Sequence, residues 1–272
     1  MGDRGRRHLG GVFDEDPALY DRARPTYPDD LFADLAAITG IAEQSTLVEV
    51  GCGTGQATRS LAALGCSVVA VEPGEALAAL ARVKLADLPT VEVETSSFEE
   101  WDAGDRRFDA VVAASSWHWV DPSLGWRRAH HGIRPGGWLA LIGATVVRRP
   151  GEPEMYAATA DLHQRLVPDN PDWRHPPLEA HVRTIERGWG AGDEDAEGWF
   201  GPPTVPWYPM VQWLDGEGFA DLLRSTSLYR RLDQAVREPL LEAIAEHIRS
   251  DMGDLLARRY LAHLRVGQRL DP

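Results

Sequence analysis

One short stretch, residues 46–60 (TLVEVGCGTGQATRS), limits what this chain can fold into more than any other. An apolar run ends at three glycines on alternate positions, Gly51, Gly53 and Gly55, and a helix-forming stretch follows. A strand, a glycine-rich turn and a helix in this order open a βαβ unit, and the glycines let a ligand approach the backbone at the carboxyl end of the strand. We therefore expect an α/β fold with a ligand site at this turn.

The same rhythm continues to residue 144, because short apolar runs alternate with amphipathic segments. Continuous apolar strands alternating with helices predict a parallel sheet that is covered on both faces. Strands are expected at 46–50, 67–72, 90–95, 108–115 and 138–144, and helices at 16–23, 29–39, 56–64, 75–84 and from Asp121-Pro122 to the RPGG sequence at 134–137.

The rhythm changes after Pro150, where residues 150–206 are rich in Pro, Gly, Trp and acidic residues. A strand at 204–213, helices at 216–226 and 233–250 and a last strand at 259–269 are expected beyond this segment. The predicted organisation is a tail and helical cap at 1–40, a core at 41–149, a substrate cap formed by an insertion at 150–230, and a C-terminal helix and strand at 231–272 that complete the core.

Composition excludes several classes of partner. The chain has 272 residues and a net charge of −14, which argues against a general affinity for nucleic acid or anionic membranes. No run of about 18 apolar residues is present, so no membrane partner is expected. The two cysteines, Cys52 and Cys66, form neither a disulfide framework nor a metal-binding spacing, so we predict no metal and a cytoplasmic setting.

The glycine turn does not match the common phosphate-binding patterns. A dinucleotide fingerprint needs a small residue at its sixth position, where this chain has Gln56. No Gly-Lys-Ser/Thr sequence follows, so a P-loop is also absent. An NAD(P)-dependent oxidoreductase is therefore disfavoured.

The sequence from Glu49 to Gly55, EVGCGTG, resembles motif I of class I S-adenosylmethionine (SAM)-dependent methyltransferases. The resemblance implies a Rossmann-like, doubly wound sheet of seven strands, mostly parallel with the last strand antiparallel. It implies SAM as the cofactor, S-adenosylhomocysteine (SAH) as its product and no metal. The residues it places at the turn are Glu49, Gly51, Cys52, Gly53, Gly55 and Gln56.

Three further segments match this family at the ends of later strands. Glu72 and Pro73 end the second strand, where the family has an acid that accepts from the ribose hydroxyls. Ser97 and Phe98 match the adenine-facing pair, although Phe98 is equally compatible with a place in the core. Ser115, which follows the fourth strand, would face the methionine part of the cofactor.

Two motifs resemble a small-molecule group within the family, the trans-aconitate methyltransferase-like proteins (methyltransferase type 11). The first is SSWHWVD at 115–121, which places His118 near the transferred methyl group as a general base or as a structural histidine. The second is YDRARPTYP at 20–28, in which Tyr20 and Arg24 would meet the cofactor carboxylate.

The predicted acceptor is a small metabolite, of the kind modified in secondary metabolism, that receives the methyl group on O, N or C. Aromatic residues in and after the insertion suit a flat aromatic or heterocyclic acceptor, although they are also ordinary core material. A non-catalytic SAM-fold regulator stays open as an alternative, as do a monomer and a homodimer. The aromatic residues are Trp173, Trp189, Trp199, Phe200, Trp207, Tyr208 and Trp213.

Overall fold

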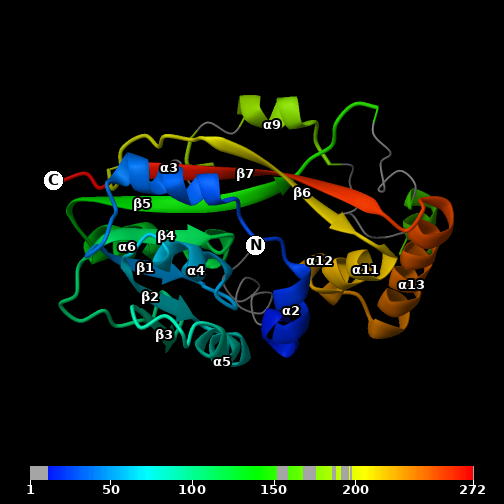
Figure 1. The fold of residues 1–272 in the computed structure, drawn as a ribbon, viewed down its shortest axis with the longest axis horizontal. Helices are drawn as coiled ribbons and strands as arrows, with labels where there is room; N and C mark the ends of the chain where they lie inside the picture. The colour runs from blue at the N-terminus through cyan, green and yellow to red at the C-terminus, as the bar shows by residue number, and fades with distance from the viewer. Residues whose placement is uncertain are drawn as a thin grey trace.

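The computed structural model describes residues 12–151, 159–167, 176–185, 188–190, 196 and 198–271. Its centre is a seven-stranded sheet with the order β3-β2-β1-β4-β5-β7-β6 (Figure 1). The strands are β1 (Thr46–Val50), β2 (Ser67–Glu72), β3 (Val91–Thr95), β4 (Phe108–Ala114), β5 (Ile133–Val146), β6 (Trp207–Leu214) and β7 (Leu256–Gln268).

The strand directions are those that the sequence predicted. Strand β1 pairs in parallel with β2 and β4, and β3 and β5 extend the parallel part on either side. Strand β7 is antiparallel to both β5 and β6, which confirms the antiparallel last strand. The strand order reverses between β1 and β4, and ligands of open α/β sheets bind outside the carboxyl ends of the strands at such a point.

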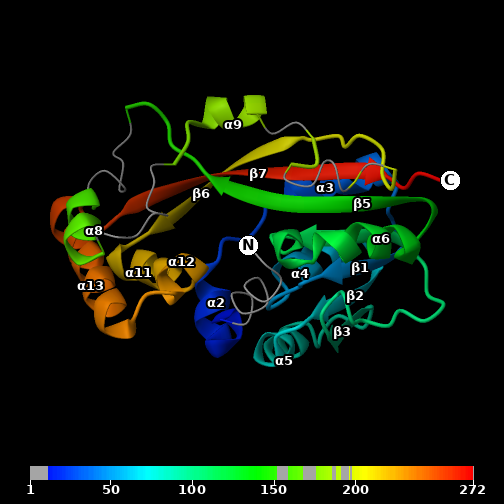
Figure 2. The same ribbon diagram turned by 180° about the vertical axis from the view of Figure 1, so that it is seen from behind.

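Helices cover both faces of the sheet, as Figures 1 and 2 show from opposite sides. Leu47 points into a core with α3 and α4, whereas Val48 and Val50 point into a second core that includes residues of α6. This explains why β1 has apolar residues on both of its faces. The helical elements are η1 (Val12–Glu15), α2 (Pro17–Ala23), α3 (Asp29–Thr39), α4 (Gln56–Ala62), α5 (Glu75–Lys84), η2 (Trp117–Trp119), α6 (Pro122–Gly132), α8 (Ala160–Leu166), α9 (Glu179–Ile185), α11 (Gly216–Arg224), α12 (Ser227–Arg230) and α13 (Gln234–Asp251).

The prediction for the start of β5 was wrong. Residues 134–137 (RPGG) do not end the preceding helix but lie inside β5, which already begins at Ile133. The pairing with β4 shifts register here and forms a bulge, which accommodates the proline and the glycines. A Cβ on Gly137 would lie 2.6 Å from the Asp109 carbonyl oxygen, so the bulge requires glycine at this position.

A cluster of helices lies beyond the carboxyl ends of the parallel strands, next to α2 (Figure 1). We call α8, α11, α12 and α13 the helical cluster. Its buried side chains, among them Phe219, Tyr229 and Ile244, share one apolar core. The expected domain boundary at residue 230 therefore falls inside a packed unit, and the cover of the sheet edge includes α13 as well as part of the predicted insertion.

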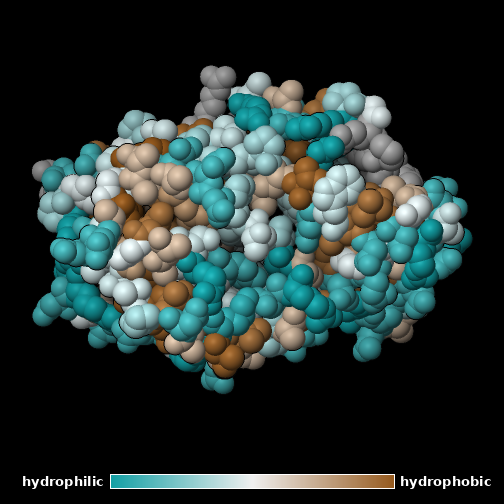
Figure 3. Space-filling view, viewed as in Figure 1, coloured by the Kyte–Doolittle hydropathy of each residue, from teal (hydrophilic) through white to brown (hydrophobic). Residues whose placement is uncertain are grey.

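The surface of the face in Figure 3 is mainly hydrophilic, and its hydrophobic residues lie in separate patches. None of the helices in the described ranges is long and apolar enough to cross a membrane.

Candidate functional site

The three glycines after β1 are required for two different reasons. All three have positive φ angles, +67° at Gly51, +59° at Gly53 and +90° at Gly55, which L side chains rarely adopt. A Cβ on Gly51 would lie 2.6 Å from Cβ of Ser116, and one on Gly55 would lie 2.8 Å from Leu85, so these two positions are closed by the protein itself. Only Gly53 faces residues that the sequence assigned to the cofactor.

Replacing Gly53 with alanine tests this distinction. The new Cβ would lie 3.4 Å from the Tyr20 ring and 3.9 Å from Oε1 of Gln56, in the space between two predicted cofactor contacts. We expect a loss of roughly 1–2 kcal/mol in the free energy of unfolding from the backbone strain and a clear loss of SAH affinity. Gly40→Ala is the matched control, because Gly40 has φ +72° with no atom within 4 Å of its Cβ position. The Gly40→Ala variant should lose similar stability and keep its SAH affinity in calorimetric titration. Equal SAH affinities for the two variants would contradict the assignment of Gly53 to the cofactor site.

Glu72 ends β2 directly beside the turn. Its side chain is buried, and its two carboxylate oxygens accept hydrogen bonds from the amides of Gly53 (2.8 Å) and Gly74 (2.9 Å). Burial raises the pKa of Glu72, these two hydrogen bonds oppose the shift, and the nearby Asp14 carboxylate adds to it. Pro73, which lies between Glu72 and Gly74 in the chain, is exposed. The carboxylate is thus held at the edge of the turn, and its predicted ribose role stays a prediction.

Asp14 belongs to this part of the site but was missed in the sequence. Its Oδ1 accepts a hydrogen bond from the amide of Leu77 (2.8 Å), so it satisfies an amide in the first turn of α5. No local signal marks it, because its partner is 63 residues away in the chain.

Helix α2 places Tyr20 and Arg24 on one face, since residues four apart in a helix are neighbours. The guanidinium of Arg24 lies 4.9 Å from the centre of the Tyr20 ring, and Nη2 donates to the carbonyl oxygen of Ser225 (2.8 Å). Within the described ranges, the buried Nε of Arg24 has no hydrogen-bond partner, and no carboxylate forms an ion pair with this arginine. An anionic ligand would satisfy it.

Two more buried polar atoms, Oε2 of Glu49 and Nε2 of Gln56, have no partner in the part of the chain that the structure describes. Burial raises the pKa of Glu49 to about 7; the neighbouring Thr58 hydroxyl lowers it and the Glu72 carboxylate raises it further. A buried polar group without a partner costs free energy, and in a native protein it calls for an explanation. Near the glycine turn, Glu49 thus supplies an acceptor for a cation, Gln56 supplies an amide donor, and Arg24 supplies a donor for an anion.

The end of β4 contains two serines with different roles. The hydroxyl of Ser116 is buried and donates to the carbonyl oxygen of Val50, which ties the end of β4 to the end of β1. Ser115 is exposed, has φ +55° and shares a hydrogen bond with the Tyr27 hydroxyl (2.7 Å). Neither Ser116 nor Tyr27 was predicted, although both lie in motifs that the sequence had singled out.

Several predicted residues contribute no side chain to this cluster. Phe98 is buried against Trp117 in the core, which matches the packing interpretation that the sequence left open. The hydroxyl of Ser97 accepts from the amide of Glu100 (3.2 Å) and so begins a turn. Cys52 is buried in a small core with Leu85 on the other side of the turn. Their predicted roles toward the cofactor are thus limited to the main chain.

His118 lies in the short helix after β4 and is exposed. Although part of the side chain reaches solvent, desolvation of the ring by the surrounding protein and the positive charge of Arg24 lower its pKa. No residue in the described ranges forms a hydrogen bond with it. Trp119 packs beside it and contacts Phe13, whose ring also lies against Tyr20. Both predicted roles of His118, as a general base or as a structural histidine, thus stay open here.

The aromatic residues of the insertion that the structure describes do not gather into one acceptor pocket. Trp189 and Phe200 pack on Trp126 against the sheet, while the Tyr208 hydroxyl donates to Asp34 at 2.7 Å from the opposite side. Trp213 is 63% exposed. Trp173 lies outside the described residues. These contacts favour the core interpretation, so the idea of a flat aromatic acceptor gains no support.

No group of three His, Cys, Asp or Glu side chains in the described ranges is arranged to hold a metal ion.

Comparison with known proteins finds methyltransferases with a similar sequence or fold. Residues 48–141 match the family described as "Methyltransferase domain". An uncharacterized methyltransferase of Mycobacterium tuberculosis is 34% identical over 146 residues, 54% of this chain and 57% of that protein. The trans-aconitate 2-methyltransferase of Variovorax paradoxus is 31% identical over 138 residues, 48% of this chain and 50% of that protein.

A solved structure of a protein described as a type II methyltransferase, from Anaeromyxobacter dehalogenans, has a similar fold. It aligns with a TM-score of 0.60 and 24% identity, over 90% of this chain and 97% of that one. The YcgJ protein of Bacillus subtilis aligns with a TM-score of 0.52 over 89% of this chain. Residues 48–141 are therefore similar to a methyltransferase domain, and the fold is the one that these solved structures have. The match spans little more than half the length of the curated relatives.

Proposed function

We propose that this protein is a SAM-dependent methyltransferase that acts on a small molecule and releases SAH. The observation that carries the proposal is the set of buried polar atoms on Arg24, Glu49 and Gln56 around a glycine turn, none of which has a hydrogen-bond partner among the described residues. An amino-acid ligand carries a carboxylate and an ammonium group, which match Arg24 and Glu49. Glu72 has capacity left for hydroxyl donors, because a carboxylate can accept about four hydrogen bonds and two are in use.

The residues present therefore fit SAM, which supplies a reactive sulfonium methyl group when bound. The chain's own contribution is mainly alignment of the two reactants and exclusion of water, and alignment of this kind supplies roughly 7–11 kcal/mol. Arg24 and Tyr20 would contact the amino-acid end of SAM. Gly53 has no side chain and would leave room for this end of SAM at the turn. The helical cluster and the segment from Phe13 to Arg24 would shield the site from solvent.

Binding comes first in the test of this proposal. Calorimetric titration with SAM and SAH should give dissociation constants in the micromolar range or below, whereas NADH should not bind. Tritiated SAM with a panel of small alcohols, phenols, amines and carboxylic acids would then identify the acceptor class. Absence of SAM and SAH binding at high micromolar concentration would refute the proposal; binding without turnover on any acceptor would favour a regulatory protein instead.

A small-molecule acceptor is favoured over nucleic acid by the net charge of −14. Both a monomer and a homodimer are compatible with the proposal, and light scattering during the same titrations would distinguish them.

His118 is proposed as the general base, and His118→Ala should lower kcat by about 10²–10⁴-fold while SAH affinity stays nearly constant. Since the pKa of His118 is lowered, the neutral form required of a base persists below pH 6.5. The acidic limb of the wild-type kcat profile should therefore lie below pH 6.5. His131→Ala is the control, because His131 is an exposed histidine of α6. Full activity of the His118 variant would contradict the role of a general base and would indicate that alignment of the two reactants is sufficient for methyl transfer.

A further inference from the structure

Helix α2 lies between the methyltransferase core and the helical cluster, and its successive side chains point in three directions. Tyr20 and Arg24 face the site, Asp21 faces the glycine turn, and Leu19, Arg22 and Ala23 face α11. Such a distribution follows from the 3.6-residue period of an α-helix.

The contact with the core depends on Asp21. Its Oδ1 accepts from the hydroxyl of Thr54 (2.7 Å), a buried residue of the glycine turn, and from the Lys84 ammonium group at the end of α5. The only lysine of the chain thus helps to attach α2 to the cofactor-binding turn.

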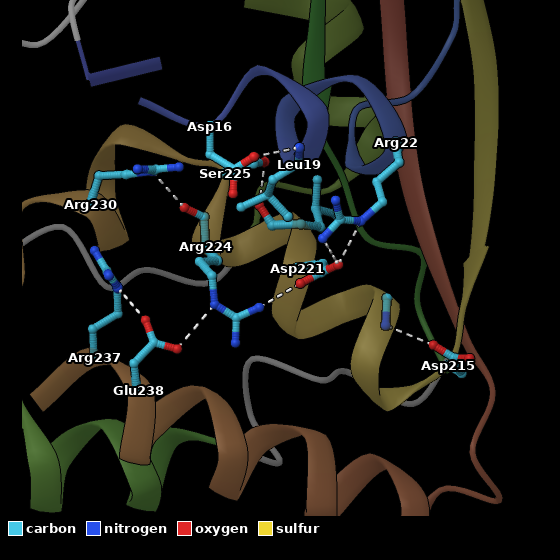
Figure 4. A network of polar contacts seen from close by, with 12 residues as sticks. Asp16, Leu19, Arg22, Asp215, Asp221, Arg224, Ser225, Arg230, Arg237 and Glu238 are labelled. Atoms are coloured by element: carbon cyan, nitrogen blue, oxygen red, sulfur yellow. Dashed lines mark hydrogen bonds and ion pairs between the residues drawn. The ribbon is translucent and has the colours of Figure 1, made fainter. Parts of the chain in front are cut away.

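The contact with α11 has an apolar and a charged part. Leu19 and Ala23 are buried against Leu222. Beside them, Nε and Nη2 of Arg22 donate to Oδ2 of Asp221 at 3.1 and 2.9 Å (Figure 4).

Asp221 is itself fixed by a chain of alternating charges within the helical cluster. Its other oxygen accepts from Arg224, and Arg224 and Arg237 both donate to Glu238, at 3.0 and 2.7 Å (Figure 4). The side chain of Asp221 is only 17% exposed, so its pairs are screened less than ordinary surface ion pairs.

The same turn of α11 also reaches Arg24. Ser225, four residues after Asp221, is the C-cap of α11, and its carbonyl oxygen accepts from Nη2 of Arg24. A cation is favoured at this end of a helix, so the contact defines where the guanidinium lies.

We infer that Asp221 is a positioning residue: through Arg22 it holds α2 on α11, so that Arg24 is placed for the carboxylate of an amino-acid-bearing nucleoside. This inference rests on the proposed function. It connects the helical cluster to cofactor affinity, although Asp221 itself faces Arg22 and Arg224 and not the glycine turn.

The experiment compares two ligands on four variants by calorimetry. The ligands are SAH and 5′-methylthioadenosine, which has the nucleoside but no amino-acid part. Asp221→Asn and Arg22→Gln should each weaken SAH binding about fivefold, as expected for loss of one partly exposed ion pair. The double variant should be no weaker than either single variant, and 5′-methylthioadenosine should bind all of them like the wild type. Asp87→Asn is the control for Asp221→Asn, because it removes the exposed Arg59–Asp87 pair with the same change in charge.

Each result decides the inference. Weaker SAH binding with unchanged 5′-methylthioadenosine binding supports it. Equal weakening for both ligands would indicate general loosening of the fold and overturn it, as would wild-type SAH affinity in both single variants. Arg22 is 59% exposed, so Arg22→Gln is informative even if Asp221→Asn does not fold. A wild-type protein that binds neither ligand would refute the proposed function, and the positioning role with it.

Discussion

Replacing Glu72 with glutamine should weaken SAH binding about 100-fold, the largest effect that we expect from a single substitution. Two charge-assisted hydrogen bonds to the ribose hydroxyls, at about 1.5 kcal/mol each, account for this size. The substitution also disturbs the turn. The two carboxylate oxygens of Glu72 accept from the amides of Gly53 and Gly74, whereas a glutamine side chain has only one oxygen. Calorimetric titration measures the change.

Two comparisons make the Glu72 experiment specific. Glu75→Gln removes the same charge from an exposed residue in the first turn of α5 and should bind SAH like the wild type. 5′-Methylthioadenosine retains the ribose, so Glu72→Gln should weaken its binding by the same factor. Unchanged SAH affinity in a folded Glu72 variant would remove the ribose role.

Glu49 should make SAH binding depend on pH. In the free protein its pKa is raised to about 7 by burial, so at pH 6 the carboxyl is mostly protonated. An ammonium group of the ligand pairs only with the ionised form, and affinity should rise by up to about tenfold per unit as the pH approaches 7. At higher pH, where the ligand's own α-amino group loses its proton, the affinity should fall again.

Calorimetry in buffers of different ionisation enthalpy should detect proton release on SAH binding below pH 7. Glu49→Gln should abolish this release and flatten the acidic side of the profile. 5′-Methylthioadenosine, which lacks the ammonium group, should show no such rise with the wild type. The same pH dependence in Glu49→Gln would assign the titration to another group.

The raised pKa of Glu49 also has a consequence for stability. Because the folded-state pKa lies above the unfolded-state value of 4.5, the buried carboxyl favours folding below pH 4.5, and this contribution is lost as the pH rises through about 7. Relative to Glu49→Gln, the wild type should lose up to about 3 kcal/mol of unfolding free energy over this interval. Urea titrations at pH 4.5 and 8 measure the difference.

The local parts of the fold were predictable from the sequence because their determinants are neighbours in the chain. The first strand, the turn and α4 follow from an apolar run, three glycines and a helix-forming stretch within 17 residues, Thr46 to Ala62. The start of β5 was not predictable in this way, since RPGG looks like a break until the register with β4 turns it into a bulge. The antiparallel last strand came from the family resemblance and not from any local pattern.

The residues of the candidate site also divide into those that could be predicted from the sequence and those that could not. Glu72 could be identified because it ends a strand next to the glycine turn in a known order. Ser116 and Tyr27 were missed since their partners, Val50 and Ser115, are 66 and 88 residues away in the chain. The two serines after β4 look alike in the sequence, and only packing against Gly51 separates the structural one from the exposed one.

The sequence by itself determined the class of fold, the position of the glycine turn and the acid after β2, because each depends on periodicity or on residues close together in the chain. Only the tertiary structure decided which glycine faces the site, which polar atoms have no partner and what holds α2 in place. Arg22 and Asp221 are 199 residues apart. Their contact is set by the way that the two ends of the chain pack at the same edge of the sheet, and no pattern within either segment encodes it.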